Sequence, residues 1–228
     1  MLKYTISLII VWFGLIGLAQ TPQPPAKDSL STVKKPVYVR FGFDIGKYLW
    51  AKLQNNSSYD AYLDAKFYDE YRLKLAAGQE THLTDNNLLN YTTKGHYYKI
   101  GVNYNLYRNW LDMNNDVTIG LNYAWANYNY HLHSYRINQP GAVYPPETVI
   151  VNQDFNNNSA QWLELETQVQ VETFKHVFLG YAVAVKYLTG HSAIDNFDTT
   201  YIPGFFNKNT YSNFGFGMQY FISYQVQF

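Results

Sequence analysis

From Val37 to Phe228, apolar side chains recur at every second position of the chain. A period of two is typical of β-strands, because successive side chains of a strand point to opposite faces of a sheet. Turn residues interrupt the alternation at intervals that divide this region into eight segments. We therefore expect these strands: Val37–Ile45 with a frayed continuation toward Trp50, Tyr59–Tyr68, Tyr71–Gly78, His96–Leu106, Val117–Trp125, Trp162–Thr173, Val177–Leu188 and Phe214–Phe228.

The two faces of these strands differ in composition. The apolar faces contain no Asp, Glu, Lys or Arg, although these residues make up 15% of the chain. A secreted sandwich or a lipocalin-like barrel would turn such a face inward as its core. The bulk of these apolar side chains, however, exceeds what a closed eight-stranded interior can hold. Against lipid the same face is favourable, since a Lys or Arg at the bilayer midplane costs about 2–4 kcal/mol. The sequence therefore predicts an all-β fold, an eight-stranded antiparallel transmembrane β-barrel of the outer-membrane type, built as an up-and-down meander.

The charged side chains fall on the opposite faces, which would line the lumen. An eight-stranded lumen is just wide enough for its own side chains, and buried charges must be compensated by partners. We therefore expect the lumen to be filled by ion pairs, with no solute-sized path through it. The predicted network consists of Arg40, Asp44, Asp60, Asp64, Lys66, Arg72, Lys74, Lys99, Glu164, Glu166 and Lys186.

Long and short connections alternate along the chain. The longer ones are Glu80–Gly95, Asn127–Gln161 and Thr189–Asn213, with a modest first loop at Ala51–Ser58. A barrel with its N-terminus in the periplasm would place this set outside the cell. Tryptophans then fall near the two rims, as in interfacial aromatic girdles: Trp50, Trp125 and Trp162 at the outer rim and Trp110 at the inner rim.

The N-terminal segment has the features of an export signal. Lys3 precedes an apolar run, Ile6–Leu18, and the small residues Gly17 and Ala19 mark a cleavage site. An uncleaved membrane anchor is the alternative, but the run is shorter than the roughly 20 residues of a spanning helix. We expect a signal peptide at residues 1–19, a Pro-containing periplasmic linker at 20–36 and the barrel at 37–228, located in the outer membrane of a Gram-negative cell.

The last strand alternates aromatic and aliphatic residues up to the chain end and resembles the signal read by the barrel assembly machinery. Its outward residues are Tyr220, Ile222, Tyr224, Val226 and Phe228. Three further stretches resemble a Bacteroidota outer-membrane family of small barrels catalogued as a domain of unknown function: VRFGFDIGKY, NYTTKGHYYKIGVNYNLYRNWLDMNN, and YIPGFFNKNTYSNFGFG leading into YFISY. The resemblance covers Val37–Phe228. It implies the fold and the location, and it brings no catalytic residues.

Composition limits the chemistry. The chain has no cysteine, and its 17 basic residues balance 17 acidic ones, so neither thiol chemistry nor nucleic-acid binding is expected. No nucleophile elbow, metalloprotease helix or phosphate loop occurs. His131 and His133 share one face of an extended segment at an acceptable metal-ligand spacing, and His191 lies in another outer loop. These histidines define an alternative site of a surface hydrolase.

Elimination leaves one leading hypothesis about function. We expect no cofactor and a non-catalytic outer-membrane barrel that serves as a structural or accessory subunit. Its partners would be outer-membrane lipid, the assembly machinery and another outer-membrane or periplasmic protein. A surface hydrolase and a ligand-binding or adhesion barrel remain the alternatives.

Overall fold

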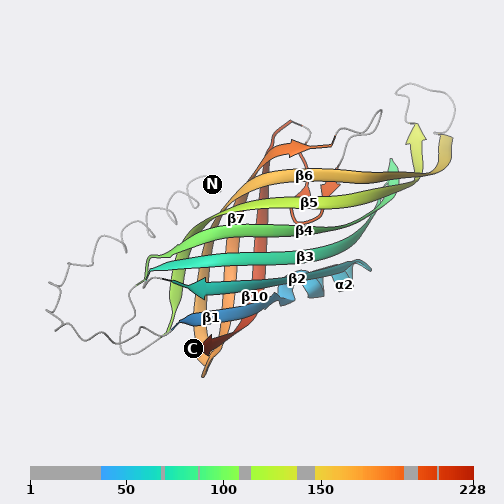
Figure 1. Cartoon of the computed structure of the whole chain (residues 1–228). Helices are drawn as coiled ribbons and strands as arrows, with labels where there is room; N and C mark the ends of the chain where they lie inside the picture. Colours follow the sequence, from blue (N-terminus) through green and yellow to red (C-terminus); the bar gives the residue numbers. More distant parts are fainter. Residues whose placement is uncertain are drawn as a thin grey trace, which may run out of the picture. The chain divides into compact units, whose positions relative to one another are not determined.

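The computed structural model describes residues 37–67, 70–86, 88–107, 114–137, 147–192, 200–209 and 211–228. Eight of its strands close into a barrel in the order β1-β10-β7-β6-β5-β4-β3-β2, and β8 pairs with β9 in a separate small sheet (Figure 1). The expected signal peptide, the linker and Trp110 lie outside the described residues. The elements are β1 (Tyr38–Asp44), α2 (Ile45–Leu53), β2 (Ser57–Lys66), β3 (Tyr71–Asp85), β4 (Leu89–Asn105), β5 (Asp116–Ile137), β6 (Glu147–Phe174), β7 (Val177–His191), β8 (Tyr201–Ile202), β9 (Phe206–Asn207) and β10 (Phe214–Gln227).

The first and last strands close the barrel. Phe41 of β1 lies opposite Tyr224 of β10 on one side and opposite Leu63 of β2 on the other. All neighbouring strands of the barrel run antiparallel, and each follows its neighbour in the chain except at the closure and where β8 and β9 intervene between β7 and β10. The predicted eight-stranded antiparallel barrel is confirmed. We call the end where Val37 and Phe228 pair through their backbones the inner end, and the opposite end the outer end.

Burial alternates along the barrel strands with the predicted period. Leu121 of β5 is 58% exposed, whereas the next residue, Asn122, is 1% exposed. The same alternation of burial runs along β6 from Asn158 to Gln170, and the inward residues from Glu164 to Gln170 are all polar. The apolar face is therefore the outer surface of the barrel, and the interpretation in which it forms an aqueous protein's core is wrong.

The strands of one wall extend well beyond the predicted outer rim. The predicted loops Glu80–Gly95 and Asn127–Gln161 are largely continuations of β3, β4, β5 and β6 (Figure 1). Cross-strand pairing continues there, for example between Thr84 and Tyr91. This extension was not predicted because its outward positions, such as Asn127 and Asn129, are polar while inward positions such as Tyr128 and Tyr130 are aromatic. The pattern is therefore the reverse of the one that marked the other strands.

The first connection also differs from the expectation. β1 ends at Asp44 and helix α2 follows directly, where a frayed strand and a loop were expected. Asp44 is the N-cap, and its Oδ1 accepts the backbone N–H of Lys47 at 2.9 Å. The helix brings Lys47 to the mouth of the lumen and leaves Trp50 65% exposed. A helix of barely two and a half turns leaves too few apolar repeats to be told from a strand by periodicity.

Candidate functional site

The candidate site is the lumen, which changes character from one end to the other. Nothing in the described part of the chain forms a helix long and apolar enough to cross a bilayer. The described residues likewise contain no cluster of three or more His, Cys, Asp or Glu side chains suited to a metal ion. What the lumen contains is an aromatic hairpin at the outer end, ion pairs in the middle and a water-accessible cavity at the inner end.

Residues 200–209, which we call the lumen hairpin, fold into the outer mouth of the barrel. Both oxygens of Glu80 hold it: Oε2 accepts from the hydroxyl of Tyr201 at 2.6 Å and Oε1 from the backbone N–H of Gly204 at 3.2 Å. Lys186 Nζ donates to the carbonyl of Gly204 at 2.7 Å, and the Tyr130 hydroxyl donates to the carbonyl of Tyr201 at 2.5 Å. The barrel wall thus supplies specific partners for the backbone of the hairpin.

Aromatic packing seals the hairpin against the wall. Phe205 is fully buried and meets the Trp162 ring edge-on, with ring centroids 5.7 Å apart. Gly204 has φ +81°, and a Cβ there would lie 2.6 Å from the Tyr97 ring, so only glycine fits. Trp162 is fully buried in this cluster, so its predicted place in an outward-facing girdle is wrong. Its position next to the outward Leu163 already put it on the lumen face.

A second group of charges lies directly beneath the hairpin. Lys47 of α2 forms an ion pair with Glu80 and donates to the hydroxyl of Tyr97 at 2.6 Å. Tyr97 in turn donates to Asp60. Glu80 and Lys47 were not among the predicted lumen residues, because Glu80 was assigned to a loop and Lys47 to a frayed strand. The inward alternation of β3 through Arg72, Lys74, Ala76 and Gly78 would have reached Glu80 had it been continued.

The middle of the lumen is occupied by two lysine–glutamate pairs, which link β4 and β3 to β6. Lys99 Nζ lies 3.0 Å from Glu164 Oε1, and Lys74 Nζ lies 2.5 Å from Glu166 Oε1. The indole N–H of Trp162 donates to the other oxygen of Glu164 at 3.2 Å. All four charged side chains are nearly inaccessible to solvent, so each depends on its partner for compensation.

Two guanidinium groups share one carboxylate at the inner end. Arg40 Nη1 and Arg72 Nη2 both donate to Asp116 Oδ2, and the Arg72 contact is 2.9 Å long. Arg40 also donates to Gln170 and to Gln225. Asp116 was not among the predicted lumen residues, because the expected strand began at Val117. Beyond these residues the lumen opens into a cavity of about 440 Å³.

The structure brings most of the predicted network together in the lumen. Several members have partners other than those expected. Asp44 caps α2, Lys186 bonds to the Gly204 carbonyl, and Lys66 is half-buried at the inner mouth. Asp60 contacts Lys47 and Tyr97, and Arg40 pairs with Asp116. Among the described residues, Lys66 forms no ion pair, and its Nζ lies 5.6 Å from the centroid of the Tyr38 ring. The members buried inside the barrel are Arg40, Asp44, Asp60, Asp64, Arg72, Lys74, Lys99, Glu164, Glu166 and Lys186.

The histidines of the alternative site lie on the extended outer part of the sheet. The rings of His131 and His133 are 4.5 Å apart, and Asp154 Oδ1 lies 2.6 Å from His131 Nδ1. His133 Nε2 lies 2.8 Å from the hydroxyl of Thr92. His191 lies 3.1 Å from Lys208 Nζ. The hydroxyl contact and the carboxylate contact therefore belong to different histidines.

The outer surface of the barrel contains the last strand, which was predicted to be an assembly signal, and an apolar groove. Residues Tyr220, Ile222, Tyr224 and Phe228 of the expected assembly signal are exposed on it, and Val226 is half-buried. An apolar groove of about 500 Å³ crosses the outward faces of β1 to β5. Ala61 and Ala77 face each other across β2 and β3 within it, and their small side chains leave it unfilled.

The geometry defines the class of protein as an eight-stranded β-barrel with an apolar exterior and an occupied lumen. Residues 1–228 match the family described as a domain of unknown function, DUF6048, and the chain belongs to that family. No curated protein matches the sequence.

Several solved barrel structures are similar in fold. They include Ail, the attachment invasion locus protein of Yersinia pestis, with 8% identity and a TM-score of 0.38 over 84% of this chain and 97% of that chain. The N-terminal β-barrel domain of Pseudomonas aeruginosa OprF has 6% identity and a TM-score of 0.40 over 84% and 97%. A major outer membrane protein from Thermus thermophilus has 10% identity and a TM-score of 0.44 over 84% and 98%.

Proposed function

We propose that the protein is an integral outer-membrane β-barrel with a sealed lumen, which acts as a non-catalytic structural or accessory subunit. The observation that carries the proposal is the opposite character of the two faces of the same strands. The outward face is apolar and exposed, and the inward face is charged and buried. Only a barrel surrounded by hydrocarbon makes both faces favourable.

The height of the apolar surface supports the membrane location. On β5 the outward apolar residues run from Val117 to Trp125, which matches the roughly 9–11 residues of a tilted spanning strand. Leu121, in the middle of that run, is 58% exposed. Aromatic pairs border the belt, with Tyr98 near Trp125 toward the outer end and Tyr71 near Tyr104 toward the inner end. An exposed apolar surface of this extent in water would cause aggregation.

The contents of the lumen argue against a solute channel. The buried Lys99–Glu164 and Lys74–Glu166 pairs lie in the middle of the lumen, and the lumen hairpin occupies the outer mouth. Opening a path would separate charges that have no access to water, which is costly. The protein therefore closes its own lumen and does not conduct solutes.

The histidine cluster gives little support to a hydrolase. A nucleophilic mechanism needs a hydroxyl, a histidine and an acid in one chain of contacts. Within the described residues, the Asp154 contact is made by His131, whereas the Thr92 hydroxyl contacts His133. The accessory role is accordingly preferred over surface hydrolysis.

The remaining elements of the proposal concern export and partners. Residues 1–19 act as a cleaved signal peptide, residues 20–36 as a periplasmic linker, and the last strand as the assembly signal, so that the inner end faces the periplasm. The groove at Ala61 and Ala77 supports contact with another outer-membrane protein, because its open volume lets a neighbouring chain approach closely.

The location and the sealed lumen are tested together. After cell lysis we expect the protein in the outer-membrane fraction, extracted only by detergent, with a folded gel band that shifts on heating. In planar bilayers the refolded protein should give no stepwise conductance. Recovery of a monodisperse protein without detergent, or stable conductance steps, would refute the proposal.

The accessory role needs a separate test. Because the chain has no cysteine, a single Ala77→Cys variant can carry a photo-crosslinker at the groove, with Leu179→Cys on another wall as its control. In native membranes we expect one crosslinked protein from position 77 and none from position 179. Equal crosslinking patterns at both positions would contradict a specific lateral partner.

A further inference from the structure

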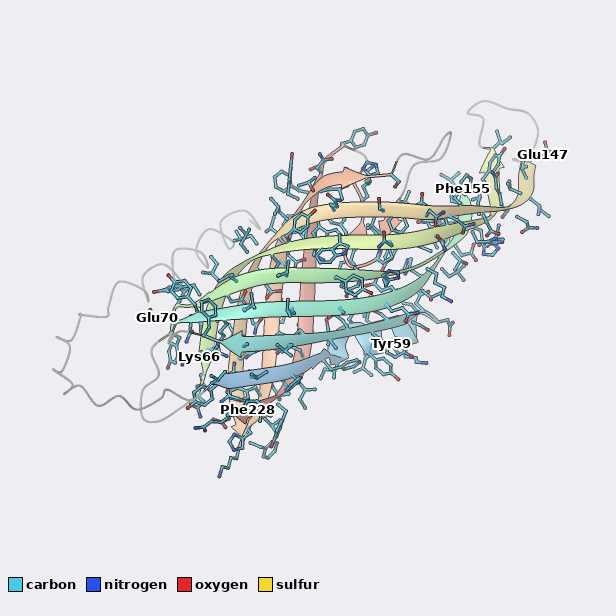
Figure 2. The ribbon with its side chains drawn as sticks, viewed as in Figure 1. Tyr59, Lys66, Glu70, Glu147, Phe155 and Phe228 are labelled. Carbon is cyan, nitrogen blue, oxygen red and sulfur yellow. The ribbon has the colours of Figure 1, made fainter. Side chains whose placement is uncertain are left out.

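The cavity at the inner end has the size and polarity of a small-molecule site. Its volume is about 440 Å³, within the usual range for such sites. Lys66 and Glu70, which line it, lie at the same end of the barrel as Phe228 and opposite Tyr59 and Phe155 (Figure 2). It opens toward the solution beyond the lumen and is separated from the lumen hairpin by the ion pairs of the middle.

The buried acceptor of this cavity is already used. Asp116 Oδ2 accepts from both Arg40 and Arg72, and Asp116 Oδ1 accepts from the side-chain amide of Asn105 at 3.0 Å. The other carboxylate of the lining, Glu70, is exposed at the rim. A positively charged ligand would therefore find no free buried carboxylate in the cavity lining.

Basic side chains outnumber carboxylates in the cavity lining, with Lys66, Arg40 and Arg72 against Asp116 and Glu70. Lys66 carries three N–H donors and has no ion-pair partner in the described part of the chain. Among the same residues, Arg72 Nη1 finds no hydrogen-bond acceptor, and Asp64 Oδ2 lies 3.8 Å from it. Buried donors of this kind are expensive to leave unsatisfied and favour an acceptor that brings its own negative charge.

We infer that the inner cavity is a binding site for a small oxyanion, either a carboxylate or a phosphate. Lys66 supplies the direct charge, and Arg40 and Arg72, whose charges are compensated by Asp116 and Asp64, lie behind it. Tyr38 and Tyr107 also line the cavity, and a tyrosine hydroxyl can act as a further donor. This site goes beyond the proposed structural role, and its presence does not depend on a lateral partner.

Titration calorimetry of the detergent-folded protein tests the site, with inorganic phosphate and succinate as probes and chloride at matched ionic strength as reference. We expect saturable binding of at least one of the two oxyanions and none of chloride. Lys66→Gln should weaken binding about tenfold or more, because one charge-assisted contact is lost. Lys66→Arg should retain most of the affinity.

The control is Lys52→Gln, which removes an exposed lysine from α2 at the other end of the barrel. It should bind as the parent does. The heat-modifiable gel band confirms that each variant is folded, and no folding defect is expected for Lys66→Gln since this lysine forms no ion pair with a described residue. Selective binding of phosphate or of succinate identifies the source of the ligand. Absence of binding by both probes, or equal binding by Lys66→Gln and Lys52→Gln, would overturn the inference.

Discussion

The two ends of the lumen are closed in different ways. At the outer end a segment of the chain itself, residues 200–209, fills the mouth and is held by Glu80, Lys186 and Tyr130. At the inner end side chains of the wall close the lumen, and a cavity of about 440 Å³ remains in front of them. The outer seal therefore depends on a loop that can be loosened alone, whereas the deeper ion pairs belong to the barrel itself.

The largest effect on the free energy of unfolding is expected from a change in the middle of the lumen, between its two ends. Glu164→Ala leaves Lys99 buried without its partner and frees the indole N–H of Trp162. Removing one partner of a buried pair costs about 3–5 kcal/mol, so the unfolding midpoint in urea should fall markedly. Glu147→Ala, at an exposed outer position, is the control and should change nothing measurable. Equal midpoints for the two variants would refute a charge network that supports the barrel.

A smaller and local effect is expected at the outer end. Gly204→Ala places a Cβ against the Tyr97 ring at a left-handed backbone position, which costs about 1–2 kcal/mol before any repacking. The lumen hairpin should then become sensitive to protease while the heat-modifiable band is kept. Gly190→Ala is the matched control, because a Cβ there meets nothing within 4 Å. Protease resistance equal to the parent's would show that the hairpin does not depend on this contact.

One hydrogen bond between the barrel wall and the lumen hairpin can be removed without changing how the side chains pack. Tyr130→Phe deletes the hydroxyl that donates to the carbonyl of Tyr201, which should weaken docking of the hairpin by about 1 kcal/mol. The exchange rate of the hairpin amides should rise by several fold, and amides in the middle of β6 should not change. A global rise along all strands would mean that the hairpin and the barrel open as one unit.

The smallest effect is the pH dependence of the docking of the lumen hairpin. Burial lowers the pKa of His82, which stacks on Tyr201, while the charge of Glu80 acts in the opposite direction. The stabilisation from neutral His82 is complete above its unfolded pKa of about 6.5 and is lost as the pH falls below that value. Protease cleavage of the hairpin should therefore be faster at pH 5 than at pH 7.5, and less so in His82→Gln. An identical pH dependence in both proteins would exclude this contribution.

The comparison of the two ends also shows what a sequence can predict. The period of two predicted the strands, their inward charges and the exposed apolar surface, because the two faces of a barrel strand place opposite requirements on neighbouring residues such as Leu121 and Asn122. It could not predict that Glu80 and Lys47 meet, since one was assigned to a loop and the other to a strand end. The lumen hairpin was equally hidden, because burial of Phe205 depends on tertiary packing against Trp162, and local pattern carries no such signal.

The most direct test of the central claim is to measure whether the outward face of the barrel is surrounded by lipid or by water. A spin label on Leu121→Cys, in protein folded into lipid vesicles, reports accessibility to oxygen and to a water-soluble nickel complex. We predict high oxygen and low nickel accessibility at this position, and the reverse for a label on Lys52→Cys. Strong nickel accessibility at position 121 would contradict a barrel whose apolar surface is bathed in lipid.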